Sequence, residues 1–226
     1  MIEIEYCGRC DYRPMWEKQQ RYFNNLIEQV RNKEEYPSEH LLIVEHNPVY
    51  TLGKHGKEEN LLADEARLRN AGAECIRIER GGDITFHGPG QLVVYPIISL
   101  AEYSLGVKDY VNLLEETIIQ FLAEYNIKGE RVEGATGVWL DKGTPRERKI
   151  CAIGVKCSHF VTMHGLALNV NTDLNYFSLI NPCGFQDKGV TSMEKELGQK
   201  IDFEGAAIRV ADILCNLLNK QVCKHK

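Results

Sequence analysis

Hydrophobic residues recur at helical spacing in three parts of the chain. In residues 14–31, 107–125 and 203–222, apolar side chains three or four positions apart alternate with charged ones. Such a stripe is typical of an amphipathic helix whose apolar face packs on a core. We therefore predict a helix in each range, and Thr191-Ser-Met-Glu194 has the spacing of a capping box that opens a further helix.

Short segments between these helices have the patterns of strands, with either alternating apolar and polar residues or continuous apolar runs. Within residues 40–53, two strands are predicted with a break at Asn47-Pro48, because proline has no N–H to donate within a sheet. The other predicted strands cover residues 73–80, 91–98, 131–140, 149–156 and 164–171.

The order of these elements predicts the class of fold. Strands come in hairpin-like runs with helices between the runs, which favours an α+β arrangement, a mixed β-sheet packed with α-helices, over a regular βαβ repeat. The chain has no internal repeat, low-complexity segment or linker, so we predict a single domain over residues 1–226. Residues 141–148 are predicted to form an exposed loop.

Composition and charge narrow the classes of function. The net charge of −5 argues against binding to nucleic-acid phosphates, which require a basic surface. No apolar run approaches the ~20 residues of a membrane span, and the first residues lack the apolar core of a signal peptide, so we expect a cytoplasmic protein without a membrane partner. The eight cysteines are then expected to be free thiols.

A glycine-rich stretch, RGGDITFHGPGQ (80–91), brings Arg80 and His87 together with four glycines. Glycine-rich loops bind phosphates when they lead into the N-terminus of a helix. This stretch instead connects two predicted strands, and neither GxxxxGK[ST] nor GxGxxG occurs in the chain, so a nucleotide site is not favoured. A histidine in a tight turn also has a structural interpretation, as a hydrogen-bond partner of the backbone.

Two further residues stand out by their neighbours: Lys149 opens an otherwise apolar strand, and Cys183 lies between Pro182 and Gly184. A cysteine in a turn is accessible, and turn amides can point at a developing oxyanion, as a nucleophile requires. Each residue also has a simpler interpretation, a solvated lysine at a strand edge and a small buried hydrophobe. The residue types alone do not decide between these interpretations.

Taken together, four stretches in this order and spacing resemble the lipoyl(octanoyl) transferases, and VEHNPVYTLGKHG (44–56) fits as well. The resemblance covers most of the chain and implies a fold shared with biotin protein ligases and lipoate–protein ligases. The four stretches are RGGDITFHGPGQLVVYPI (80–97), GVWLDKGTPRERKICAIGVK (137–156), FVTMHGLALNVNTDL (160–174) and INPCGFQDKGVTS (180–192).

The resemblance implies an acyltransferase that moves an octanoyl or lipoyl group through a thioester on Cys183. Lys149 would lower the pKa of the Cys183 thiol and act as general acid and base. Substrate contacts would come from the residues of three stretches, namely Arg80, Gly81, Gly82, Asp83, Ile84, Thr85, Phe86 and His87, then Ala152, Ile153 and Gly154, and finally His164, Gly165, Leu166 and Ala167.

The resemblance also implies the partners. The donor would be acyl carrier protein, which carries phosphopantetheine, and the acceptors would be the lipoyl domains of 2-oxoacid dehydrogenases and the glycine cleavage H protein. No ATP and no metal would be required, and a monomer is expected. Because such partners are typically acidic, we expect the basic residues within 141–156 to dock them. These are Lys142, Arg146, Arg148, Lys149 and Lys156, set against Asp141 and Glu147.

Three alternatives stay open. An ATP-dependent lipoate or biotin ligase of the same fold would need no cysteine at position 183. An amidotransferase would move lipoyl or octanoyl groups between proteins. A non-catalytic module could hold a metal at Cys7-Gly8-Arg9-Cys10, although neither a second CxxC nor a pair of histidines is near enough in sequence to complete a zinc site.

Overall fold

A large twisted sheet forms the centre of the molecule. The computed structural model describes residues 2–181 and 189–224 of the chain, and among these, eight strands belong to the large sheet. All neighbouring strands are antiparallel except the first pair and the last short strand, which pair in parallel. In spatial order they are β1 (Ile2–Cys10), β2 (Glu39–His46), β6 (Gln91–Ile97), β10 (Val161–Asn169), β9 (Arg148–Ser158), β8 (Ala135–Leu140) and β7 (Glu130–Val132), with β11 (Gly189–Val190) alongside β9.

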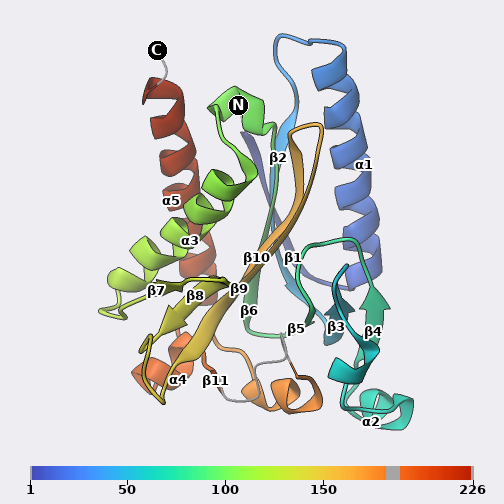
Figure 1. Ribbon diagram of the computed structural model, residues 1–226, viewed down its shortest axis with the longest axis vertical. Helices are drawn as coiled ribbons and strands as arrows, with labels where there is room; N and C mark the ends of the chain where they lie inside the picture. The colour runs from blue at the N-terminus through green and yellow to red at the C-terminus, as the bar shows by residue number, and fades with distance from the viewer. Residues whose placement is uncertain (1, 182–188, 225–226) are drawn as a thin grey trace.

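A smaller, three-stranded sheet lies beside the large one (Figure 1). It consists of β4 (Glu74–Arg77), β3 (Val49–Leu52) and β5 (Ile84–His87), in that order. The predicted break at Asn47-Pro48 is confirmed, and it separates β2 in the large sheet from β3 in the small one. The small sheet carries part of the glycine-rich stretch, because β5 lies within that stretch and pairs with β3.

Helices cover both faces of the large sheet. The alternation of side chains along β2 shows why, since Leu41 and Ile43 belong to one core cluster and Leu42 and Val44 to another. The first cluster packs under α3 (Val107–Ala123) and α5 (Phe203–Lys224), and the second under α1 (Tyr12–Arg31). The three predicted long helices and the predicted class, mixed sheets packed with helices, are confirmed (Figure 1).

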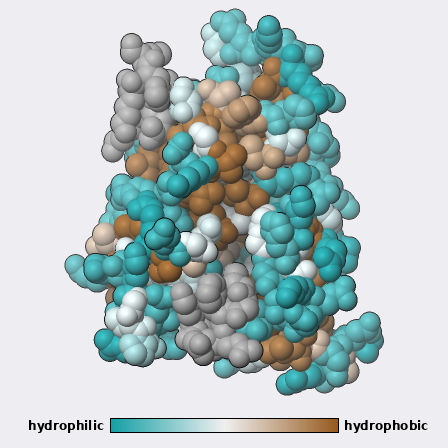
Figure 2. Space-filling model, in the orientation of Figure 1, coloured by the Kyte–Doolittle hydropathy of each residue, from teal (hydrophilic) through white to brown (hydrophobic). Residues whose placement is uncertain are grey.

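The remaining helices are short and lie in the connections. No helix of the described residues is long and apolar enough to cross a membrane. Apolar surface lies in the upper middle of the face shown in Figure 2, with hydrophilic surface to either side. The short helices are η1 (Glu58–Asn60), α2 (Glu65–Asn70), η2 (Leu100–Tyr103), η3 (Leu174–Leu179) and α4 (Met193–Leu197).

Three local expectations differ from the structure. Strand β1 was not predicted, because its charges conceal a strand whose exposed positions lie at the sheet edge. Residues 131–140 form a hairpin of two strands rather than one strand. The predicted capping box is wrong by one residue, because Ser192 caps α4 by accepting the Lys195 N–H at 3.2 Å, whereas the Thr191 hydroxyl donates to Glu196.

The cysteine pair of the CxxC motif lies on β1. A bulge between Tyr6 and Arg9 puts an extra residue into the strand, and Cys7 and Cys10 both pack against the core cluster under α1. Both are free thiols, and burial raises the pKa of each, to about 11 for Cys10. Within residues 2–181 and 189–224, no group of three or more candidate ligands is arranged to hold a metal ion.

The HGPG turn between β5 and β6 tests how tightly the glycine-rich stretch is held. At Gly90 φ is 78°, and a Cβ atom there would lie 2.2 Å from the Asn171 carbonyl oxygen. Gly72, which lies outside this turn, serves as the comparison, because its φ is also positive, at 64°, but a Cβ atom there would have no atom within 4 Å. We expect Gly72→Ala to cost about 1–2 kcal/mol of unfolding free energy from backbone conformation alone. Gly90→Ala should cost at least twice as much, because the carbonyl must also move. Urea denaturation of both variants checks this, and equal costs would contradict it.

Candidate active site

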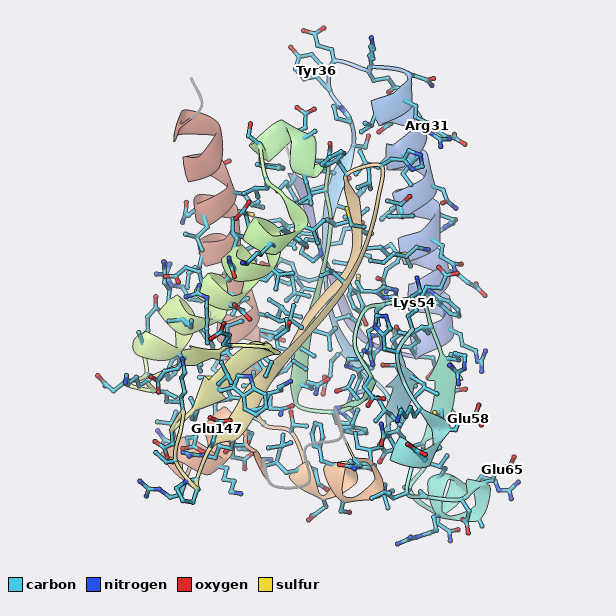
Figure 3. The ribbon with its side chains drawn as sticks, viewed as in Figure 1. Arg31, Tyr36, Lys54, Glu58, Glu65 and Glu147 are labelled. Carbon is cyan, nitrogen blue, oxygen red and sulfur yellow. The ribbon has the colours of Figure 1, made fainter. Side chains whose placement is uncertain are left out.

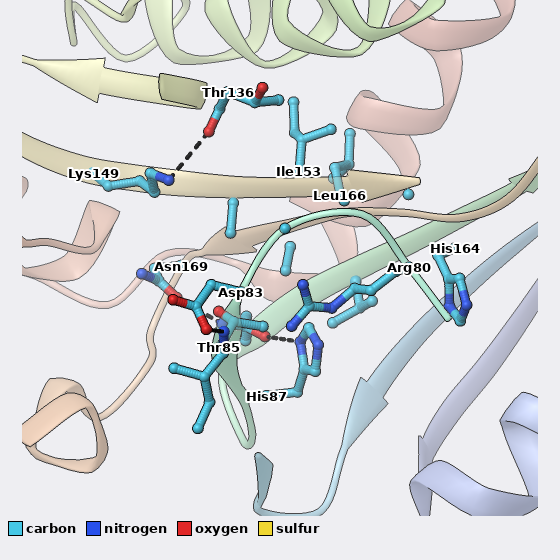
Figure 4. A pocket seen from close by; sticks show the side chains of 18 of the residues that line it. Arg80, Asp83, Thr85, His87, Thr136, Lys149, Ile153, His164, Leu166 and Asn169 are labelled. Carbon is cyan, nitrogen blue, oxygen red and sulfur yellow. Dashed lines mark hydrogen bonds between the residues drawn. The ribbon is translucent and has the colours of Figure 1, made fainter. Parts of the chain in front are cut away.

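A cavity of about 460 Å³ lies between the small sheet and the β8–β9–β10 part of the large sheet. Its size is in the range of pockets that enclose a small ligand. Most of the residues predicted to contact substrate line it, together with Lys149 (Figure 4). They are Arg80, Gly82, Asp83, Ile84, Thr85, His87, Ala152, Ile153, Gly154, His164, Gly165, Leu166 and Ala167.

Two of the predicted site residues do not line the cavity, and the structure does not describe a third. Phe86 does not line the cavity, because its fully buried ring stacks on Tyr176 with centroids 4.5 Å apart. Gly81 also lies outside the lining, and its N–H donates to the Val155 carbonyl at 3.0 Å. Cys183, the predicted nucleophile, lies outside the described residues.

Lys149 is the second residue of β9, and its side chain lines the cavity. Its Nζ donates to the Thr136 carbonyl at 3.1 Å and lies 4.5 Å from the centroid of the Trp139 ring, within the range of a cation–π interaction. The antiparallel pairing of β8 and β9 sets this contact, because Trp139 is directly opposite Lys149. The lysine is therefore held over an aromatic surface at one end of the cavity.

The described residues that follow the Cys183 segment are attached directly to Lys149, and those that precede it are attached to Asn60. After the segment, β11 pairs in parallel with β9, with Val190 opposite Lys149, and the Thr191 N–H donates to the Lys149 carbonyl at 2.9 Å. Before the segment, the Asn181 N–H donates to the Asn60 carbonyl at 2.7 Å. The described chain thus resumes beside the cavity, which Gly189 and Val190 line.

Two glycines that line the cavity are directly paired on the neighbouring strands β9 and β10. Gly154 is paired with Gly165. A Cβ at Gly154 would lie 2.8 Å from the Gly81 carbonyl oxygen and 3.2 Å from Arg80 Cδ, and one at Gly165 would lie 2.2 Å from the Val94 carbonyl oxygen. The glycine-rich stretch can therefore approach β9 closely because Gly154 has no side chain, whereas the missing side chain at Gly165 lets β10 lie close to β6.

A chain of buried hydrogen bonds holds Arg80 in place. Its guanidinium donates to the Thr51 carbonyl at 2.6 Å and to the Thr51 hydroxyl oxygen at 3.0 Å. The Thr51 hydroxyl lies 3.4 Å from His87 Nε2, and His87 Nδ1 lies 2.8 Å from the Gln91 Oε1 atom. Because that amide oxygen can only accept, Nδ1 carries the proton and Nε2 accepts from Thr51.

The same chain continues into the large sheet. The Gln91 amide nitrogen donates to Asn169 Oδ1 at 2.9 Å, and the Asn169 amide nitrogen donates to the Thr191 carbonyl at 3.0 Å. Burial lowers the pKa of His87 well below its usual value, with the charges of His46 and Arg80 adding to the effect. His87 is therefore neutral, with both ring nitrogens in hydrogen bonds, one to Thr51 and one to Gln91.

A second buried group, which the sequence did not indicate, forms part of the cavity wall. Tyr12 and Tyr95 line the cavity, and the His46 ring lies against both, with centroids 5.0 Å from Tyr12 and 5.9 Å from Tyr95. His46 Nε2 is 2.8 Å from the Tyr95 hydroxyl and its Nδ1 is 3.2 Å from the Cys10 carbonyl. Burial lowers the pKa of His46 to about 4, so the neutral ring donates to the carbonyl through Nδ1 and accepts from Tyr95.

His164 differs from the other buried histidines of this region. It is only 2% exposed and lines the cavity, yet neither ring nitrogen has a hydrogen-bond partner among the described residues. Its backbone has a φ of 63°, a left-handed conformation that is uncommon for a residue with a side chain. Burial lowers its pKa to about 3, so the ring is neutral near pH 7.

Solved structures identify the class of fold. A bipartite lipoate protein ligase of Thermoplasma acidophilum matches with a TM-score of 0.65 and 14% identity over 98% of this chain and 84% of that one. P. falciparum LipL1 in complex with lipoate has a TM-score of 0.68 and 11% identity over 97% of this chain and 61% of that one. This molecule therefore has the fold of the lipoate–protein ligases.

Sequence comparison identifies the family. The chain belongs to the family of the lipoyl protein ligase A/B catalytic domain, whose model matches residues 11–214. A protein of Bacteroides fragilis named octanoyltransferase is 54% identical over 210 residues, which cover 92% of this chain and 95% of that protein. A Parabacteroides distasonis octanoyltransferase is 55% identical over 212 residues, covering 93% of this chain and 95% of that protein.

The buried histidines predict how stability depends on pH. The pKa values of His46 and His164 are lowered in the folded protein to about 4 and about 3, so the unfolded chain binds protons first as the pH falls below 6.5. Stability should therefore be lost progressively from pH 6.5 down to about pH 4, by about 1.4 kcal/mol per pH unit for each histidine. Denaturation of wild type and His164→Asn between pH 7 and pH 4.5 checks this. An unchanged slope in the variant would contradict it.

Proposed function

We propose that this chain transfers an octanoyl group from acyl carrier protein to a lysine of a lipoyl domain, through a thioester on Cys183. The observation that carries the proposal is the cavity of about 460 Å³ lined by Lys149, in a chain more than 50% identical to proteins named octanoyltransferase. The acceptors proposed are the lipoyl domains of 2-oxoacid dehydrogenases and the glycine cleavage H protein, and a lipoyl group is proposed as a second cargo.

In the first half-reaction, Lys149 takes the proton of the Cys183 thiol, and the thiolate attacks the octanoyl thioester of the carrier. A new C–S bond forms to Cys183 and the C–S bond to phosphopantetheine breaks. The leaving thiolate takes the proton back from the Lys149 ammonium, which leaves a neutral amine. The Trp139 ring and the Thr136 carbonyl favour the ammonium form that this exchange requires.

In the second half-reaction, the neutral amine of the acceptor lysine attacks the thioester carbonyl. An amide bond forms, the C–S bond to Cys183 breaks, and Lys149 takes the proton that the acceptor nitrogen loses. The enzyme returns to the thiolate–ammonium pair. Conversion of a thioester to an amide is downhill, so the proposal requires neither ATP nor a metal.

The cavity walls suit a slim alkyl chain. Ile84, Ile153, Leu166 and Ala167 supply apolar surface beside the two facing glycines. Burial of about seven alkyl carbons at ~0.8 kcal/mol each would contribute roughly 5–6 kcal/mol to binding. This is enough to disfavour much shorter acyl groups.

Replacement of Cys183 tests the proposal directly. Incubation with octanoyl carrier protein, without ATP, should add one octanoyl group to the wild-type enzyme, detectable by mass and mapped to Cys183. Cys183→Ser should form no such thioester adduct and should lower transfer to a lipoyl domain by at least ~100-fold, the usual scale for loss of a catalytic group. Lys149→Met should slow adduct formation by a similar factor, because the thiol is then less ionised.

The matched control is Cys157→Ser, since Cys157 is a half-buried thiol of β9 that does not line the cavity. Its adduct and its rate should match those of the wild type. Retention of ATP-dependent transfer by Cys183→Ser would overturn the proposal and would favour a ligase mechanism. An adduct that arises only from protein-bound octanoyl groups would favour an amidotransferase.

Docking of an acidic partner depends on fewer residues than the basic stretch suggests. Arg148 is engaged internally, because its guanidinium donates to Glu196 at 2.8 Å and to Asp141 at 2.6 Å. Lys156 pairs with Glu79. Lys142 and Arg146 lie on the exposed β8–β9 connection, near the residue labelled Glu147 in Figure 3. Arg146 Nε lies 3.7 Å from Asp141 Oδ2, but the Arg146 side chain is 82% exposed and so stays accessible to a partner. We therefore assign docking to Lys142 and Arg146.

Charge reversal of these two residues tests the assignment. Lys142→Glu/Arg146→Glu should raise the apparent KM for the carrier several-fold at low salt and flatten its salt dependence, while kcat stays similar. The control Lys33→Glu/Lys108→Glu changes two other exposed lysines by the same charge. Equal effects of both pairs would mean that net charge, rather than this loop, governs association.

A further inference from the structure

The cavity ends in a polar side chain without a partner. His164 lines the cavity, and both of its ring nitrogens are buried without a hydrogen bond among the described residues. Gln19 lies against it, with Gln19 Oε1 accepting the His164 N–H at 3.2 Å, and the Gln19 amide nitrogen is also buried without a partner. An unpaired buried polar group is costly, so native proteins normally supply it with a partner.

His164 lies at the opposite end of the cavity from Lys149. Figure 4 shows the two at opposite sides of the labelled residues, with Arg80 and His87 between them. The residue of β9 that pairs with His164 is Val155, which lies six positions from Lys149 along the strand. At ~3.3 Å per residue, the backbones of Lys149 and Val155 are about 20 Å apart. The two side chains occupy part of this span.

The remaining length suits a medium-length chain. One extended residue of a protein backbone contains three bonds and spans at most ~3.6 Å. By the same measure, the seven C–C bonds of an extended eight-carbon acyl chain span about 9 Å. A thioester held near Lys149 would thus direct the last carbons of an octanoyl group toward His164. A methyl group there would leave the imidazole unpaired, whereas a neutral imidazole offers one N–H donor and one acceptor nitrogen.

We propose that His164 makes the far end of the acyl pocket polar, so that the pocket also takes medium-chain acyl groups with a hydrogen-bonding substituent, a hydroxyl or a thiol, on the last carbons. This inference rests on the proposed octanoyl transfer. It adds a substrate class, acyl groups of octanoyl length that carry a polar end, and it identifies the residue that selects for that end.

The experiment compares octanoyl and 8-hydroxyoctanoyl groups, each loaded on the same carrier protein, in transfer to a lipoyl domain. In an apolar pocket end, the unpaired hydroxyl would lower kcat/KM by roughly 10–100-fold. We expect the wild type to use both donors within about fivefold of each other, because His164 pairs with the hydroxyl. In His164→Leu, the ratio of hydroxyoctanoyl to octanoyl kcat/KM should fall by at least ~10-fold.

The control is His159→Leu, because His159 also has a positive φ, of 52°, but does not line the cavity. Its donor ratio should equal that of the wild type. If His164→Leu does not fold, His164→Gly accepts the backbone conformation and should lower the ratio in the same direction, whereas His164→Asn should preserve more of it.

A wild-type preference for octanoyl above about 30-fold, or a donor ratio that is the same in wild type and His164 variants, would overturn the inference. Absence of octanoyl transfer in the wild type would instead overturn the proposed function. The two failures are therefore distinguishable within one set of assays.

Discussion

The buried hydrogen-bond chain from Arg80 to Asn169 is the interaction on which the site depends. Thr51 and His87 belong to the small sheet, whereas Gln91 and Asn169 belong to the large one. Because every donor in this series of hydrogen bonds meets an acceptor, the two sheets have one relative position in which all of its polar groups are paired. The cavity lies between these sheets, so this series of hydrogen bonds sets the width of the cavity. Through the Thr191 carbonyl, it also fixes the backbone that follows the Cys183 segment.

Burial keeps the three histidines at the cavity and behind it neutral. His46, His87 and His164 all have lowered pKa values, with desolvation as the largest cause in each case. A neutral imidazole has one donor and one acceptor, which makes it a directional hydrogen-bonding group rather than a charge. In the proposed mechanism, proton transfer is therefore left to the lysine at the edge of the cavity, where the thiol and the acceptor amine can reach it.

Sequence patterns predicted the amphipathic helices and the apolar strands, but not the contacts between distant segments. Helices α1, α3 and α5 were predicted because each has one apolar face. Strand β1 was missed because it lies at a sheet edge, where exposed positions need not be apolar. The contributions of Tyr12 and Tyr95 to the cavity were missed because no motif surrounds Tyr12 and because Tyr95 is one of many apolar residues in β6. Only the folded arrangement brings them to the wall.

The region around Gly165 shows how a strand can form both a slot and its end. The paired glycines at 154 and 165 remove side chains from the middle of β9 and β10, and the glycine-rich stretch lies against the sheet at Gly154. One residue earlier, His164 has a left-handed backbone, a conformation that costs about 1–2 kcal/mol for a residue with a Cβ. That conformation redirects the side chain relative to a regular strand and leaves the imidazole at the cavity wall. Together, the backbone strain and the unpaired ring are costs that binding of a complementary ligand can offset.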